Sequence, residues 1–153
     1  MPLNPTFAER VYPATAPYLV GREKVREFAA AIGDTSPATH DLAAARARGH
    51  ADLVAPPTFA IALTMRAEGQ VMFDPELGLD MSRVLHREQT FDYRRPLRAG
   101  DEVTVTVSVA RIDEVGGHDL LTLVSDVRAV DGEHVCTTTS TLVCRAAAGS
   151  PDA

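Results

Sequence analysis

One segment of the chain, PPTFAIALTMRAEGQVMF at residues 56–73, is apolar almost throughout. Its only charged residues are Arg66 and Glu68. The two prolines at its start have fixed backbone angles that suit the first turn of a helix, so the sequence predicts a helix over Phe59 to Phe73. A helix with so little polar surface must be surrounded by protein, because an amphipathic surface helix keeps a wide polar face in water.

The second half of the chain predicts strands that can surround this helix. Its clearest pattern is the alternation of valine with threonine or serine at residues 103–109, which is typical of a half-buried strand. The four predicted strands cover residues 84–95, 103–109, 120–130 and 133–145, and Asp131-Gly132 suits a tight hairpin turn between the last two. A long apolar helix followed by antiparallel strands indicates an α+β domain with the hot-dog fold, in which a curved antiparallel sheet wraps around the helix.

In the strand at residues 84–95, simple alternation predicts one face that carries Leu85, Gln89, Phe91 and Tyr93. His86 then lies on the other face among mostly polar neighbours. That position favours the rim of the sheet, although a histidine opposite the apolar helix could also face a bound acyl chain.

The first half of the chain predicts two shorter helices. One covers residues 22–32, with apolar side chains at the offsets of a single helix face, and the other covers residues 41–48 and begins with an aspartate that can cap it. Each ends at or just before a glycine, which suits a helix C-terminus. Because there is no internal repeat or low-complexity linker, we expect residues 1–153 to form one domain with an ordered core at about residues 7–146.

Composition and charge exclude several classes of protein. Hydrophobic residues make up 45% of the 153 residues and charged residues 24%, as in ordinary globular domains. A net charge of -6 argues against a protein that binds duplex nucleic acid. The start of the chain lacks the pattern of a signal peptide and no run of about 18 apolar residues follows, so we expect a cytoplasmic protein that does not span a membrane. Cys136 and Cys144 have no partner at metal-ligand spacing and are predicted to be small buried residues.

The residues capable of chemistry are densest in the segment GDTSPATHD at residues 33–41. Aspartate, serine and proline each favour turns for local reasons, so the segment can be a turn without any function. If it is functional, Asp34, Ser36 and His40 are the candidate catalytic residues, because carboxyl and imidazole groups are the usual general acids and bases.

This segment and three later ones resemble, in order, the MaoC-like dehydratases and R-specific enoyl-thioester hydratases. The resemblance covers roughly residues 18–145. Within this family, the sequence is most similar to the actinobacterial (3R)-hydroxyacyl-carrier-protein dehydratase subunits and to the N-terminal halves of hydratases with two hot-dog domains. The matching segments are Asp34-Thr35-Ser36-Pro37 with His40, Gly49-His50-Ala51-Asp52 leading into Ala55-Pro56-Pro57-Thr58-Phe59, Leu85 to Phe91, and Arg95 to Asp101.

The resemblance implies that water is removed from a (3R)-3-hydroxyacyl thioester, or added to a trans-2-enoyl thioester, in fatty-acid metabolism and without a metal or organic cofactor. His40 would take the proton at C2 and Asp34 would assist the leaving hydroxyl. Two departures matter: His40 follows Asp34 by six residues where the family has five, and Ser36 replaces an asparagine. An extra residue moves the imidazole by about 3.8 Å, so the chain is either an enzyme whose loop bulges or a non-catalytic acyl-binding partner.

The resemblance also implies an acyl thioester, on coenzyme A or on a carrier protein, bound by a homodimer or by a heterodimer with a catalytic hot-dog homologue. Backbone N–H groups at the start of the long helix would stabilise the thioester oxygen. The arginines near residue 95 could contact phosphates of the carrier, or could simply form a solvated strand face. The predicted substrate-binding residues are Pro57, Thr58, Phe59, Leu63, His86, Arg94 and Arg95.

Two alternatives stay open. In a non-catalytic partner the wall of the acyl channel would be Phe59, Leu63, Met65, Met72 and Phe73, although ordinary core packing explains most of these residues. In a hot-dog thioesterase, a less favoured activity, Glu68 would be the carboxylate that acts as base or nucleophile.

Overall fold

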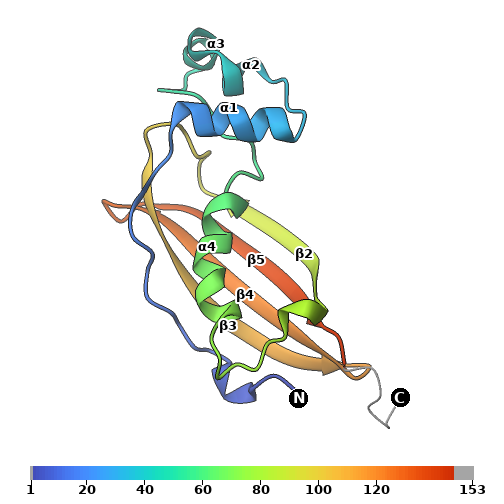
Figure 1. The fold of residues 1–153 in the computed structure, drawn as a ribbon. Helices are drawn as coiled ribbons and strands as arrows, with labels where there is room; N and C mark the ends of the chain where they lie inside the picture. Colours follow the sequence, from blue (N-terminus) through green and yellow to red (C-terminus); the bar gives the residue numbers. More distant parts are fainter. Residues whose placement is uncertain (1, 147–153) are drawn as a thin grey trace.

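A five-stranded antiparallel sheet curves around one central helix in the computed structural model, which describes residues 2–146 (Figure 1). The strand order is β1-β3-β4-β5-β2. The predicted α+β fold, a curved sheet around the long apolar helix, is therefore confirmed. The strands are β1 (Tyr18–Leu19), β2 (Val84–Tyr93), β3 (Glu102–Val115), β4 (His118–Ala129) and β5 (His134–Cys144).

The central helix is α4 (Ile61–Met72), which lies across the concave face of the sheet, called here the inner face (Figure 1). Residues 57–60 form the turn before it, so the helix begins two residues later than the sequence predicts. Its buried side chains, such as Ala67 and Val71, pack with the valines of β3 and leucines of β4 in one core. Phe59 in the preceding turn is fully buried and packs edge-to-face on Phe28, with ring centroids 5.3 Å apart.

Three short helices cover one end of the sheet (Figure 1). They are α1 (Arg22–Ala31), α2 (Pro37–His40) and α3 (Leu42–Ala47), so both predicted helices are present and a third lies inside the predicted loop. The Asp41 carboxylate accepts a hydrogen bond from the Ala44 N–H at 2.7 Å, which is the predicted cap of α3. None of the helices in residues 2–146 is long and apolar enough to cross a membrane.

A bulge in β2 contradicts the predicted faces of that strand. His86 is paired with Leu142 and Glu88 with Thr141, so Arg87 is an extra residue. Val84 and His86 therefore lie on the inner face together with Gln89, Phe91 and Tyr93, whereas Leu85 lies on the outer face. The prediction was wrong for Leu85 and His86 because simple alternation does not allow for an inserted residue.

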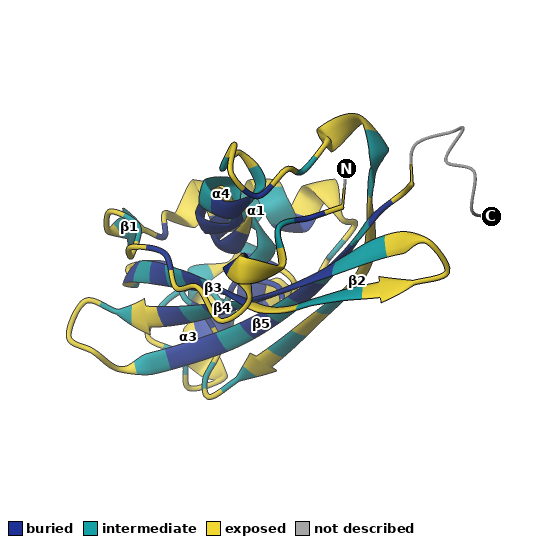
Figure 2. Ribbon diagram, turned by 90° about the horizontal axis from the view of Figure 1, so that it is seen from below, coloured by how far each residue is buried: buried dark blue, intermediate teal, exposed yellow. Residues whose placement is uncertain are grey.

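The two edges of the sheet differ. Along β3, the N-terminal segment adds backbone hydrogen bonds, from Glu9 N to Val109 O at 2.7 Å and from Tyr12 N to Val107 O at 2.9 Å. At the opposite edge, β2 has no neighbouring strand within residues 2–146, and most of its residues are exposed (Figure 2). One edge is thus closed by the chain itself and the other is open.

Candidate functional site

A hollow of about 360 Å³ lies beneath the predicted functional loop, and we call it the loop pocket. Its walls come from three segments that the fold brings to the same end of the sheet: the loop around α2, the segment before α4, and the chain that follows β2. Most of these wall residues are apolar. The lining residues are Asp34, Ser36, Ala38, Thr39, Val54, Ala55, Pro56, Pro57, Tyr93, Arg94, Arg95, Pro96 and Leu97.

Asp34 and Ser36 line the loop pocket, but His40 does not. The Asp34 carboxylate accepts a hydrogen bond from the Ser36 N–H at 2.8 Å, as in a tight turn. The His40 Nε2 atom lies 2.6 Å from the Asp34 carbonyl oxygen, so Nε2 must carry a proton and donate it. The His40 imidazole thus binds the backbone of the loop that carries it.

The physical reason is the single helical turn of α2. Asp41 N donates to Pro37 O at 2.8 Å and closes the turn, so residues 37–40 form a helix rather than an outward bulge. Arg26 Nε donates to the His40 carbonyl at 3.0 Å and ties the end of α2 to α1. His40 is consequently held by three hydrogen bonds in or next to its own turn.

The structure brings together only part of the predicted substrate-binding set, because Pro57, Arg94 and Arg95 line the loop pocket and the other four residues do not. Pro57 lines the loop pocket, whereas Thr58 is exposed outside it and Phe59 is fully buried in the core. Leu63 lines a different hollow, of about 210 Å³, between α4 and the N-terminal segment. His86 lies seven residues before Tyr93 along β2, which corresponds to roughly 23 Å, so it is far from the loop pocket.

The two arginines that line the loop pocket have different surroundings. Arg95 Nη1 lies 2.8 Å from Asp101 and its Nη2 lies 3.0 Å from Glu133. The hydrogen bond with Asp101 raises the pKa of Arg95, and its charge is already neutralised by these partners. Arg94 is exposed and has no ion-pair partner within residues 2–146, so it is the arginine available to an anionic ligand.

Tyr93 is a lining residue that the sequence analysis did not select. Its hydroxyl donates a hydrogen bond to the Pro57 carbonyl at 2.7 Å. Burial raises the pKa of Tyr93, and the Ala60 backbone N–H acts in the opposite direction, which indicates that this N–H faces the hydroxyl. The tyrosine therefore occupies part of the helix start where a thioester oxygen was expected. Its alternation with Gln89 and Phe91 was the signal that could have identified it.

Glu68, the residue on which a thioesterase would depend, is 4% exposed and lines none of the three hollows described here. The Ser140 hydroxyl donates to its carboxylate at 3.0 Å, and burial raises the pKa of Glu68. The hydroxyl groups of Thr64, Ser125 and Thr138 are also buried, and none has a hydrogen-bond partner among residues 2–146. Glu68 thus belongs to a polar cluster inside the domain and is sealed from substrate.

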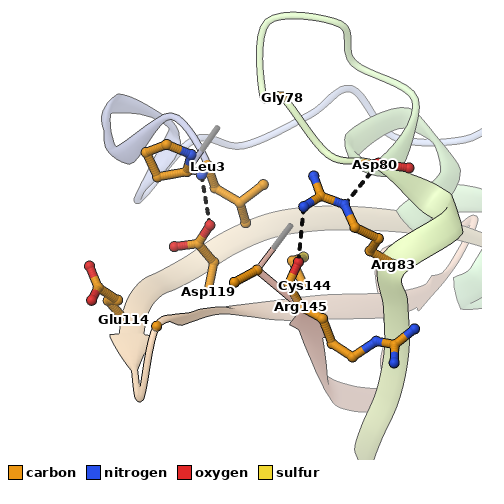
Figure 3. A pocket seen from close by; sticks show the side chains of 11 residues that line it. Leu3, Gly78, Asp80, Arg83, Glu114, Asp119, Cys144 and Arg145 are labelled. Atoms are coloured by element: carbon orange, nitrogen blue, oxygen red, sulfur yellow. Dashed lines mark hydrogen bonds and ion pairs between the residues drawn. The ribbon is translucent and has the colours of Figure 1, made fainter. Parts of the chain in front are cut away.

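A further hollow of about 250 Å³ lies at the far end of the sheet (Figure 3). The Leu3 N–H donates to Asp119 at 2.9 Å, which fastens the N-terminal segment to the sheet, and Arg83 donates to Asp80 at 2.8 Å. Within residues 2–146, no group of three or more His, Cys, Asp or Glu side chains is arranged to hold a metal ion.

A curved sheet around a central helix, with an aspartate loop above a mainly apolar pocket, defines a hot-dog domain of the dehydratase type. The chain belongs to the family described as FAS1-like, dehydratase domain region, whose model matches residues 9–138. It is 52% identical to UPF0336 protein SCO4636 of Streptomyces coelicolor, over 96% of this chain and 98% of that protein. It is also 46% identical to a UPF0336 protein of Thermobifida fusca, over 98% and 99% of the two chains.

Solved structures agree with this assignment. A MaoC-like dehydratase superposes with a TM-score of 0.86 at 37% identity, over 92% of this chain and 43% of that one. The HadBC (3R-hydroxyacyl-ACP dehydratase) complex of Mycobacterium tuberculosis gives 0.79 at 29% identity, over 90% and 96%. The predicted resemblance to MaoC-like dehydratases is confirmed, and this chain spans less than half the length of the first of these structures.

Proposed function

We propose that this chain is the acyl-thioester-binding subunit of a (3R)-3-hydroxyacyl-thioester dehydratase or trans-2-enoyl-thioester hydratase. One observation carries the proposal: Asp34 and Ser36 line the loop pocket, whereas His40 is turned onto the Asp34 carbonyl and does not line it. The loop pocket is therefore lined by a carboxyl group but by no histidine. Misplacement of a catalytic group by about 1 Å can cost ~10²-fold in rate, so the proton transfer at C2 falls to a partner chain.

The chemistry of the loop pocket supports a thioester ligand. Val54, Pro56 and Leu97 offer apolar walls to an acyl group, and Arg94 offers an exposed cation to the phosphates of coenzyme A or of a carrier protein. Pockets of roughly 300–1,000 Å³ with apolar walls and few polar groups are typical of small-ligand sites. The proposed substrates belong to fatty-acid metabolism, and we expect the cytoplasm as the compartment.

The proposed partner is a second hot-dog chain that adds to the open edge of β2. Met65 of α4 is 59% exposed, and Phe73, which follows the helix, is 73% exposed. Exposed apolar side chains of this size and an unpaired strand edge each favour pairing with another chain. The HadBC relative is described as a complex, which supports a heterodimer, and a homodimer is the other arrangement.

The test is an assay of the purified chain with crotonyl and longer trans-2-enoyl thioesters, alone and mixed with a homologue that has the five-residue spacing. We expect the chain alone to be inert and the mixture to be active. His40→Ala should leave the rate of the mixture nearly unchanged, as should His50→Ala, a matched control in the neighbouring loop. Turnover by the isolated chain that His40→Ala abolishes, but His50→Ala does not, would establish an enzyme in its own right.

A further inference from the structure

The ring of Tyr93 forms the inner wall of the loop pocket. Tyr93 lines the pocket, whereas the next residue on its face of β2, Phe91, does not. The two rings stack with their centroids 6.4 Å apart and their planes at 14°. The Tyr93 ring therefore stands between the pocket and the inner face of the sheet that continues under α4.

Two attachments hold this ring in place. Its backbone is paired with Cys136 of β5, and its hydroxyl donates to the Pro57 carbonyl at 2.7 Å, just before α4. The side chain thus spans the gap from the sheet to the start of the helix. Turning it aside would break this hydrogen bond, which is unfavourable unless water replaces the carbonyl.

The region behind Tyr93 is unsuited to hydrocarbon. On the inner face, Phe91 is paired with Thr138 and Gln89 with Ser140. The Thr138 hydroxyl is buried without a partner, and Ser140 donates to the buried Glu68 carboxylate. An alkyl chain inserted there would lie against buried polar groups and offer them no hydrogen bond, so this region favours hydrocarbon less than an apolar pocket does.

We propose that Tyr93 limits the length of the acyl group and that the loop pocket takes short-chain acyl thioesters. This inference rests on the function proposed above. A volume of about 360 Å³ is near the lower limit of small-ligand pockets, so the thioester and a few carbons fill it. A longer chain meets the Tyr93 ring and then the polar cluster around Glu68.

Binding of saturated acyl-CoAs tests the limit, because they lack the double bond that hydration needs and so cannot turn over. Calorimetric titration with acetyl-, butyryl-, hexanoyl- and octanoyl-CoA should give the wild-type chain an affinity that rises from acetyl to butyryl and then levels off. In Tyr93→Ala the affinity should continue to rise for those carbons that fill the volume left by the ring, by about fourfold for each methylene buried there. Tyr93→Leu, which keeps an apolar strand residue, should move the limit in the same direction if the alanine variant does not fold.

Two controls separate the ring from other effects. Tyr93→Phe keeps the wall and loses only the hydroxyl, so it should retain the wild-type length profile. Tyr18→Ala truncates a half-buried tyrosine beside the 210 Å³ hollow on the other side of α4 and should retain it as well. These two control variants distinguish the loss of the Tyr93 ring from a general loosening of the fold.

The possible failures are distinct. Equal length profiles in wild type, Tyr93→Ala and Tyr93→Leu, with measurable binding throughout, would overturn the length limit and leave the proposed function intact. The same holds if wild type already gains affinity steadily up to octanoyl-CoA. Absence of binding to every acyl-CoA, both alone and with the active homologue, would overturn the proposed function and this inference with it.

Discussion

Replacing Glu68 by glutamine should stabilise the domain more at pH 8 than at pH 4. Burial raises the pKa of the Glu68 carboxyl above its ordinary value of 4.5. In the unfolded chain the group loses its proton near that ordinary value, whereas in the folded chain it stays protonated to a higher pH. The contribution of Glu68 to the stability of the wild type is therefore fully present below pH 4.5, and it is lost as the pH rises through the folded pKa. Glutamine cannot ionise and escapes this loss.

The Ser140 hydroxyl determines how much the Glu68→Ala substitution lowers the free energy of unfolding. It is fully buried and donates to Glu68 at 3.0 Å, so Glu68→Ala leaves it without an acceptor, which costs roughly 1–3 kcal/mol. The lost Cγ methylene adds ~0.8 kcal/mol. At pH 4, where the wild-type carboxyl is neutral, Glu68→Ala should therefore unfold with a free energy about 3 kcal/mol lower, whereas glutamine keeps an acceptor for Ser140.

Urea denaturation at half-unit intervals from pH 4 to pH 8 measures both effects. The difference in unfolding free energy between Glu68→Gln and wild type should grow with pH and then reach a plateau. Glu27→Gln, a change on an exposed helix surface, should give a difference that is small at every pH. A constant difference between Glu68→Gln and wild type across this range would refute the reasoning, because it would mean that burial does not disfavour the ionised carboxyl.

Three further predictions concern pairing, the carrier and the core. Light scattering should give a mass of about twice 16.4 kDa for the wild type or for its complex. Phe73→Lys should lower that mass, whereas Val11→Lys, on the closed edge of the sheet, should not. A wild type that stays monomeric with every partner tested would count against pairing. Arg94→Glu should weaken acyl-CoA binding and reduce its dependence on salt, which screens exposed charges over ~8–10 Å, whereas the exposed Arg111→Glu should change neither. Phe59→Ala should lower the free energy of unfolding by about 3–5 kcal/mol, because it removes a fully buried ring, and a loss below 1 kcal/mol in denaturant would contradict that burial.

The main elements of the fold were predictable because they depend on periodic patterns that many residues share. The alternating valines of β3 and the apolar residues of α4 each repeat a signal over several positions. The bulge at Arg87 was not predictable in this way, since one inserted residue leaves no periodic trace and is recognised only from the pairing with β5. The same bulge moved His86 to the inner face, at the open edge of β2.

The sequence indicates which segments line the candidate pocket, but not the geometry of their side chains. The motif at Asp34 and the prolines before α4 do meet at one pocket. The role of each side chain, however, depends on individual contacts that residue identity does not reveal. Arg94 and Arg95 are adjacent and chemically alike, yet Arg95 is held by Asp101 and Glu133 while Arg94 is exposed.

The orientation of His40 has a cost that bears directly on catalysis. To reach a substrate in the loop pocket, the imidazole must leave the Asp34 carbonyl, and the α2 turn must release the contacts from Asp41 N to Pro37 O and from Arg26 to the His40 carbonyl. At ~1 kcal/mol net for each of three hydrogen bonds, the open loop lies about 3 kcal/mol above the closed one. That corresponds to roughly 1% of molecules, so a reaction that depends on His40 would be slowed about 10²-fold relative to a site that is already organised. A partner that supplies a preorganised histidine avoids this cost, which is why the two-chain arrangement is favoured over catalysis by this chain alone.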